Sequence, residues 1–128
     1  MAMRIALVAI GGAAGAVARY LLGLWIATRV GPDFPWATFA INLSGAFLIG
    51  VVLGLATEGI VSPELRLLLA VGVLGGYTTF STFAYETLEL LLDGNMVAFL
   101  LNAAGQLGGG LLAVALGLIV SRVLGGAR

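Results

Sequence analysis

The 128-residue chain contains neither cysteine nor histidine, and all six of its basic residues are arginine. Without cysteine and histidine it can form no disulfide, no thiolate or imidazole metal site and no histidine acid–base pair. The arginines are scattered and the net charge is zero, which also excludes the basic patch of a nucleic-acid-binding protein. Only 9% of the residues are charged, whereas 61% are hydrophobic. This composition is typical of an integral membrane protein.

Four apolar segments cover most of the chain, and each has the roughly 20 residues that a helix needs to cross a bilayer. They run over residues 5–30, 36–57, 65–92 and 96–123. Short turn sequences separate them at residues 31–35, 58–64 and 93–95. The sequence therefore predicts an all-α integral membrane fold, with one domain over residues 1–128 and four transmembrane helices. We expect a multi-pass protein of the plasma membrane or the bacterial inner membrane.

The third apolar segment contains a run that makes a poor uninterrupted helix, Gly75-Gly76-Tyr77-Thr78-Thr79-Phe80-Ser81-Thr82-Phe83. In hydrocarbon every backbone N–H and C=O needs a partner within the protein, so a broken helix survives only where protein or a water-filled path surrounds it. We predict that the third helix is broken in the middle of the membrane. Such a break is typical of a permeation path or an ion-binding element.

Polar side chains inside the predicted spans favour self-association, because four helices offer little protein with which to enclose them. Glycines four residues apart would let helices approach closely for this purpose. Such pairs occur in every span: Gly11 and Gly15, Gly50 and Gly54, Gly72 and Gly76, and Gly105 and Gly109.

Arg19 and three side-chain amides each allow a structural and a functional interpretation. Arg19 lies past the middle of the first span and could attract an anion, but a guanidinium in a narrow pore would hold the anion too tightly. We therefore favour a structural cation that neighbouring carbonyls or an acidic residue satisfy. Asn42, which shares a helix face with Thr38, could form an interhelical hydrogen bond or donate N–H groups to a permeating anion. Asn102 and Gln106 repeat this spacing on the fourth helix.

Hydroxyl groups and aromatic rings alternate along the third span. Thr79, Thr82 and Glu86 share one stripe of the predicted helix, and Phe80 and Phe83 form the stripe beside it. The two rings could simply pack, but the positive edge of an aromatic ring can also stabilise a small anion without binding it deeply. Conduction needs such moderate binding. Glu86 is expected toward an aqueous end, as a solvated carboxylate.

These residues give the chain a resemblance to a known family over essentially its whole length. The run from Gly75 to Phe83 is the most specific part. It is accompanied at matching intervals by Gly11-Gly12-x-x-Gly15-Ala16-x-x-Arg19-Tyr20 and Asn42-x-x-Gly45-x-Phe47-x-x-Gly50. With these motifs the chain resembles the Fluc/CrcB family of fluoride channels.

The resemblance implies an antiparallel, dual-topology homodimer in the lipid membrane, with two fluoride pores that both chains line. It implies passive, selective export of fluoride and hence fluoride resistance. The alternative is a small dual-topology exporter that couples drugs to protons, but that class needs a buried carboxylate in the first helix, where this chain has only Arg19. An enzyme is disfavoured because the candidate nucleophiles have no His, Lys or Cys partner.

Roles for individual residues follow from the resemblance. Phe80 and Phe83 match the rings whose edges face fluoride, and Asn42 matches the pore-lining amide. Backbone carbonyls of Gly75 and Thr78 match the site of a structural sodium ion at the centre of the dimer, and Arg19 matches a structural arginine. Where the family often has Ser or Thr on the fourth helix, this chain has Gly108-Gly109-Gly110, Ala113 and Val114. Asn102 and Gln106 would have to replace them, and the complete predicted fluoride path is Phe80, Phe83, Asn42, Thr79, Ser81, Thr82 and Gln106.

Orientation in the membrane is where charge and resemblance disagree. Both termini and the second loop lie on one side, with Arg4, Arg66, Arg122 and Arg128, against Arg29 on the other. Positive-inside counting would place that side in the cytoplasm. The bias is small and the resemblance implies insertion in both directions, so we predict dual topology.

Overall fold

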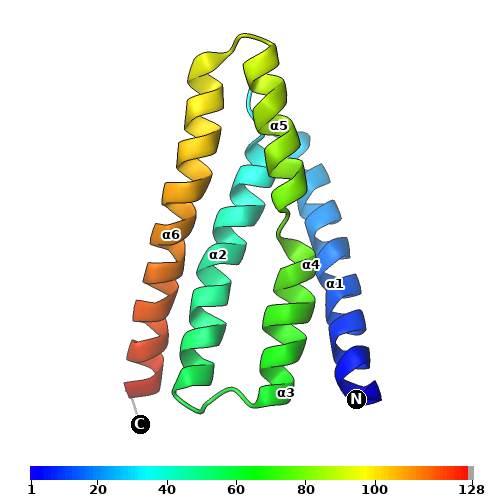
Figure 1. Ribbon diagram of the computed structural model, residues 1–128, viewed down its shortest axis with the longest axis vertical. Helices are drawn as coiled ribbons and strands as arrows, with labels where there is room; N and C mark the ends of the chain where they lie inside the picture. Colours follow the sequence, from blue (N-terminus) through cyan, green and yellow to red (C-terminus); the bar gives the residue numbers. More distant parts are fainter. Residues whose placement is uncertain (127–128) are drawn as a thin grey trace.

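The protein is an elongated bundle of helices, and the computed structural model describes residues 1–126 of it (Figure 1). The first two spans are α1 (Ala2–Ala27) and α2 (Trp36–Thr57), and the last is α6 (Met96–Gly126). The third comprises α3 (Pro63–Arg66), the π-helical η1 (Leu67–Leu74), α4 (Gly75–Tyr77) and α5 (Phe80–Leu92). All four spans are long and apolar enough to cross a membrane, which confirms the predicted fold class.

The helix bounds follow the predicted segments, with shifts at the ends. The second segment, 36–57, coincides with α2, but the first helix covers Ala2–Ala27 instead of 5–30. It ends early because the Thr28 hydroxyl donates to the Trp25 carbonyl (2.8 Å) and the Arg29 N–H donates to the Ile26 carbonyl (2.8 Å). These local bonds replace the helical pattern with a turn. The last helix is 31 residues long, against 22 for α2.

The third span is broken as predicted, but at the two threonines and not at the glycines before them. Thr78 and Thr79 are extended, with φ/ψ of −79°/158° and −149°/114°. Gly75 and Gly76 remain helical in α4. Gly76 is needed for packing, because a Cβ at this position would overlap the carbonyl oxygen of Gly12 in α1.

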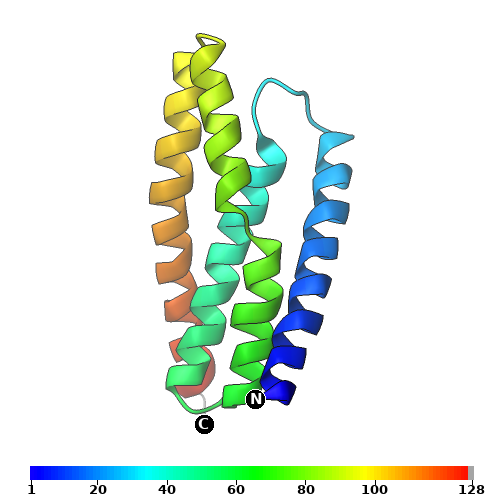
Figure 2. The same cartoon turned by 45° about the vertical axis from the view of Figure 1, so that its right-hand side comes forward.

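The break lets the third span change its neighbour. Before the break, η1 and α4 pack on α1, whereas beyond it α5 packs on α6 (Figures 1 and 2). The α2 and α6 helices lie side by side along their length. Since α5 leans toward α6, it diverges from α1 in the half of the bundle beyond the break.

Glycines lie at close contacts between helices of the same chain. A Cβ at Gly11 would lie 3.0 Å from the Gly72 Cα, and one at Gly50 would lie 3.2 Å from the Gly117 Cα. The Gly105 position faces the ring of Phe39. The expectation that these glycine pairs serve contacts between subunits is thus wrong for the pairs seen here, because they fill seams inside the subunit.

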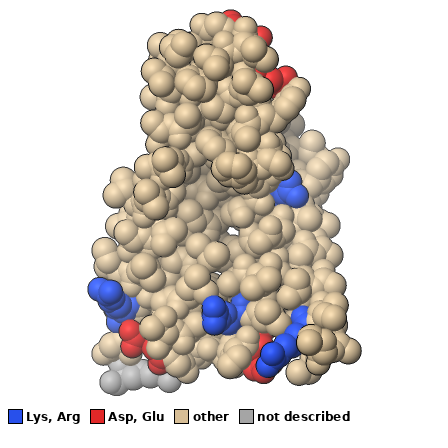
Figure 3. All heavy atoms as spheres, viewed as in Figure 1, with Lys and Arg blue, Asp and Glu red and all other residues tan. Residues whose placement is uncertain are grey.

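Charged side chains gather toward the two ends of the molecule. On the face in Figure 3, most Arg, Asp and Glu side chains lie near the two ends, and one basic side chain lies at about mid-height on the right-hand side. Burying a charge in hydrocarbon costs several kcal/mol, so the surface with few charges between the two ends matches the part that the membrane would surround.

Replacing Gly117 by alanine should destabilise the fold, because its Cβ would overlap the Phe47 carbonyl and lie 2.9 Å from the Val51 nitrogen. Overpacking of this kind costs about 1–3 kcal/mol. The matched control is Gly108→Ala on the same helix, where a Cβ meets nothing within 4 Å. Thermal unfolding of the detergent-purified protein should show a lower Tm for G117A and an equal or higher Tm for G108A. Equal Tm values for G117A and the wild type would contradict the glycine seam.

Candidate functional site

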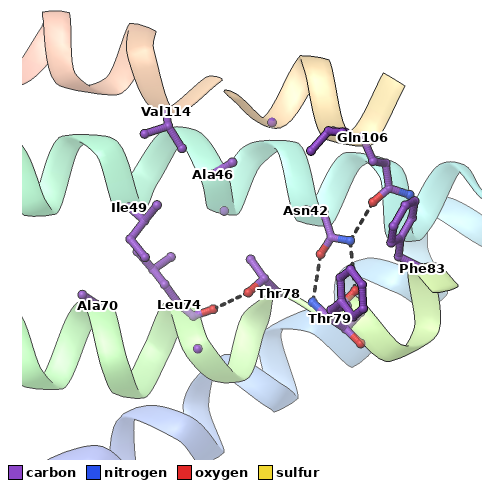
Figure 4. Close-up of a pocket in the computed structure, with 15 residues that line it drawn as sticks. Asn42, Ala46, Ile49, Ala70, Leu74, Thr78, Thr79, Phe83, Gln106 and Val114 are labelled. Carbon is purple, nitrogen blue, oxygen red and sulfur yellow. Dashed lines mark hydrogen bonds between the residues drawn. The ribbon is translucent and has the colours of Figure 1, made fainter. Parts of the chain in front are cut away.

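A cavity of about 390 Å³ lies beside the break, between α2, α6 and the third span (Figure 4). Its wall is largely apolar, and the polar side chains gather where the helix is interrupted. The lining residues are Asn42, Gly45, Ala46, Ile49, Ala70, Leu74, Gly75, Thr78, Thr79, Phe80, Phe83, Gln106, Leu107, Gly110 and Val114. The structure thus brings six of the predicted site residues into one cavity wall with Gly75: Asn42, Thr78, Thr79, Phe80, Phe83 and Gln106.

Asn42 holds the backbone at the break. Its Oδ1 accepts a hydrogen bond from the Thr79 N–H (2.8 Å), and its Nδ2 donates to the Thr79 carbonyl (3.0 Å). Thr79 is the extended residue before α5, so its N–H lacks the acceptor that an unbroken helix would provide. The side chain of α2 supplies that acceptor and also bonds the Thr79 carbonyl. This pairing meets the requirement that a backbone group inside a membrane be satisfied by the protein.

Asn42 and Gln106 join α2 to α6 at the same place. Asn42 Nδ2 donates to Gln106 Oε1 (2.7 Å), so both hydrogens of Nδ2 already have acceptors. Gln106 Nε2 in turn donates to Oδ1 of Asn102 (2.9 Å), which is fully buried and is not part of the cavity wall. The structural interpretation of these amides, an interhelical hydrogen bond, is therefore realised, and Gln106 also borders the cavity.

Phe80 and Phe83 form the aromatic part of the wall. Their ring centroids are 5.7 Å apart and the rings are tilted by 58°. Phe80 is 78% exposed in the single chain, and Phe83 is half-buried. Figure 4 shows Phe83 at the same end of the cavity as Asn42 and Gln106. The two rings and the amides of Asn42 and Gln106 therefore border a common space.

The hydroxyl residues divide between local bonds and cavity walls. Thr79 Oγ1 donates to Thr82 Oγ1 (3.0 Å) and accepts the Thr82 N–H (3.4 Å), which caps the first turn of α5. Thr78 Oγ1 donates to the Leu74 carbonyl (3.0 Å). Ser81 is exposed and does not border the cavity.

A second cavity, of about 250 Å³, opens where α1 and α5 diverge. It is lined by Arg19, Tyr20, Gly23, Leu24, Ala37, Thr38, Ile41, Thr79 and Thr82. Arg19 Nε donates to the Gly76 carbonyl (3.2 Å) at the end of α4, so this guanidinium has a carbonyl partner. Thr79 borders both cavities.

Glu86 does not behave as the solvated carboxylate that we expected. Its Oε1 accepts a hydrogen bond from the Thr38 hydroxyl (2.9 Å), and its Oε2 is buried without a hydrogen-bond partner. Sequence reasoning placed Thr38 on one face with Asn42, but it could not show that this face turns toward α5. By contrast, Glu89 is exposed.

Two carbonyl oxygens at the break, those of Gly75 and Thr78, lack a hydrogen-bond donor among the described residues. In an unbroken helix the Thr79 N–H would donate to the Gly75 carbonyl, but it donates to Asn42 instead. Within residues 1–126, no hydrogen bond ends on the carbonyl of Gly75 or of Thr78. The same residues include no cluster of three His, Cys, Asp or Glu side chains that could hold a metal. Unwound backbone carbonyls are ligands that suit sodium.

Comparisons with known proteins agree on one family. The family described as CrcB-like protein, Camphor Resistance (CrcB), matches residues 6–118. The chain is 54% identical over 114 residues to a fluoride-specific ion channel FluC of Thermus thermophilus, an alignment that covers 89% of this chain and 90% of the relative. Relatives with the same name from Acidobacterium capsulatum and Trichormus variabilis are 48% and 46% identical, and the alignments cover 92% of this chain and 95% and 88% of theirs.

Proposed function

The chain belongs to the CrcB-like family, and from this premise we propose that it is a fluoride-selective ion channel that lets fluoride leave the cell passively. The observation that carries the proposal is the cavity wall in which Phe80, Phe83 and the Asn42–Gln106 pair meet beside the helix break. Ring edges and N–H donors suit a small anion and repel a cation.

The site would bind fluoride only moderately, as conduction requires. Both hydrogens of Asn42 Nδ2 are already donated, to Thr79 and to Gln106. An anion that reaches Asn42 must therefore replace one of these acceptors, and the lost hydrogen bond offsets part of the gain. Ring edges add attraction without a full positive charge. Arg19, which lines the second cavity and donates to a carbonyl, serves as a structural charge in this proposal.

We propose further that the working unit is a homodimer. The wall that carries Phe80 is exposed in the single chain, and a second copy would cover it and complete the path. The glycine seams are used inside the subunit, so the contact between subunits would rely on the cavity face itself. An antiparallel pair places like breaks against each other near one two-fold axis.

We propose that the backbone carbonyl oxygens of Gly75 and Thr78 coordinate a sodium ion at that axis. These oxygens fit the ion, because no hydrogen bond within residues 1–126 satisfies them. Two copies would supply twice the number of ligands, while one copy supplies too few to replace a hydration shell. The positive charge of the ion would offset the repulsion between carbonyl oxygens that face one another at the dimer centre.

Fluoride efflux from liposomes tests the function and its aromatic residues together. The wild type should release fluoride, and not chloride, without a proton gradient. Phe80→Ile and Phe83→Ile remove the ring edge but keep apolar bulk, and each should lower fluoride flux about tenfold or more. Phe99→Ile on α6, outside the cavity wall, is the control and should keep its flux. A fluoride electrode follows the release, and size-exclusion chromatography checks the assembly. Near wild-type flux in both ring variants would show that the rings only pack.

Replacing sodium tests the ion site. Because a ligand that binds only the folded state raises its stability, the Tm of the detergent-purified protein should rise with sodium concentration and then saturate. Potassium and N-methylglucamine at equal ionic strength are the controls and should give a lower Tm. The same Tm in all three cations would contradict a sodium site at the break.

Single cysteines test the orientation, since the natural chain has none that would react. Glu64→Cys and Asp93→Cys place a thiol at exposed positions on opposite ends of the bundle. An impermeant maleimide applied to intact cells should label about half of the molecules of each variant, as an antiparallel pair requires. Arg4, Arg66 and Arg122 lie on one end and Arg29 on the other, while Arg128 lies outside the described residues. Complete labelling of one variant and none of the other would establish a single orientation.

A further inference from the structure

A chain of buried hydrogen bonds continues from the cavity wall into the bundle, away from the proposed fluoride path. We call it the amide relay: the side chains of Asn42, Gln106 and Asn102, followed by the hydroxyl of Thr87. Asn102 is fully buried, and Gln106 and Thr87 are each 8% exposed. Neither Asn102 nor Thr87 borders either cavity at the break. The relay ends on backbone groups of the third span, the Phe83 carbonyl at one end and the Thr79 N–H at the other.

Thr87 determines the direction of the relay. Its hydroxyl donates its one hydrogen to the Phe83 carbonyl (2.6 Å), one turn earlier in α5. The Thr87 oxygen can then only accept a further hydrogen bond. Asn102 must therefore turn its NH₂ group toward Thr87, and its Nδ2 donates to Thr87 Oγ1 (2.8 Å).

Each later amide inherits its orientation from the one before. With Nδ2 on Thr87, Asn102 presents Oδ1 to Gln106, which donates from Nε2 (2.9 Å). Gln106 then presents Oε1 to Asn42, which donates from Nδ2 (2.7 Å) and keeps Oδ1 for the Thr79 N–H. Turning any one amide by half a rotation would set two donors or two acceptors against each other. Because water does not reach the buried members, such a mismatch could not be relieved.

We propose that Thr87 is a positioning residue that acts through Asn102. By orienting Asn102, it determines that the oxygen of the Gln106 amide faces Asn42. Asn42 then keeps its NH₂ group toward Gln106 and its Oδ1 toward the Thr79 N–H, a bond that we call the Thr79 clamp. Its effect on fluoride rests on the proposed function, whereas its effect on the clamp does not. Thr87 also holds the carbonyl of Phe83, the residue that carries one of the two rings, so the relay connects the ring and the amides.

Substitutions of Thr87 distinguish its effect on the orientation of the amides from its contribution to packing. Thr87→Val keeps the shape but removes the hydroxyl, so Asn102 loses the acceptor that orients it. We expect fluoride flux and fluoride-over-chloride selectivity to fall roughly five- to tenfold, the equivalent of one lost hydrogen bond. Thr87→Ser keeps a hydroxyl that can bond the same carbonyl and should restore both. The control is Thr57→Val, which removes the like bond from Thr57 Oγ1 to the Leu53 carbonyl outside the relay.

A double-mutant cycle tests whether Thr87 acts through Asn102. Asn102→Leu breaks the relay at its centre, so adding T87V to it should change fluoride flux no further. Multiplying fold-losses in the double variant would overturn the proposal, as would wild-type flux and selectivity in a folded T87V dimer. Loss of dimer in T87V that serine does not rescue would also overturn it, because Thr87 would then be needed for packing alone.

Hydrogen exchange at Thr79 gives a second reading that does not depend on fluoride. The Thr79 N–H has Asn42 Oδ1 as its acceptor, so NMR exchange at this one amide reports the far end of the relay. It should exchange roughly five- to tenfold faster in T87V and N102L and unchanged in T87S and T57V. If the wild type does not pass fluoride, the proposed function fails and this exchange decides the relay by itself. Equal exchange in T87V and the wild type would refute it.

Discussion

A backbone peptide that has left its helix inside a membrane must find new partners, and this constraint governs the structure around Thr79. The N–H and C=O of Thr79 are both taken by one side chain, the amide of Asn42. An amide is suited to this because it carries a donor and an acceptor side by side, as a peptide does. These two hydrogen bonds fix the position of α2 relative to the third span. The position of α6 is fixed in turn, because Gln106 bonds the same amide of Asn42.

The break also explains how four helices can border two cavities. A straight third span would follow α1 or α6 along its whole length, but the extended pair Thr78–Thr79 directs its halves to different neighbours. One cavity lies on the α6 side of the break, and the other opens where α5 leaves α1. Thr79 borders both cavities, and hydrogen bonds hold its N–H, its carbonyl and its hydroxyl.

Most of the fold could be predicted from the sequence, because apolar length and turn residues report directly on membrane spans. The location of the break could not be predicted, because it depends on a competition between helix propensity, close packing and alternative hydrogen-bond partners. Gly75 and Gly76 are poor helix formers by about 1 kcal/mol each, but close packing of Gly76 on Gly12 offsets that preference. Thr78 and Thr79 leave the helix because Asn42 offers Thr79 an alternative partner. The π-helical η1 had no signal in the sequence that we recognised.

The sequence predicted which residues belong to the candidate site, but it did not predict which of them form hydrogen bonds with one another. The spacing of Asn42, Asn102 and Gln106 marked them as polar groups inside spans, and the structure joins all three. Which amide faces which depends on the rotation of each helix about its axis, and a single sequence does not specify it. Thr87 was missed for the same reason, because a threonine on a helix usually bonds its own preceding turn and nothing else.

The unequal lengths of the neighbouring helices α2 and α6 make the thickness of the bilayer a variable for this protein. At 1.5 Å per residue, the 22 residues of α2 span roughly 33 Å, close to a typical hydrocarbon core, whereas the 31 residues of α6 span roughly 46 Å. A change in lipid chain length can be absorbed by tilting the longer helix, but the seam between Gly50 and Gly117 resists sliding along the shorter one. The stress would then fall on contacts farther along the same pair, where Asn42 meets Gln106. A bilayer of a different thickness would therefore load the contact between Asn42 and Gln106 through the mismatch of two apolar helices.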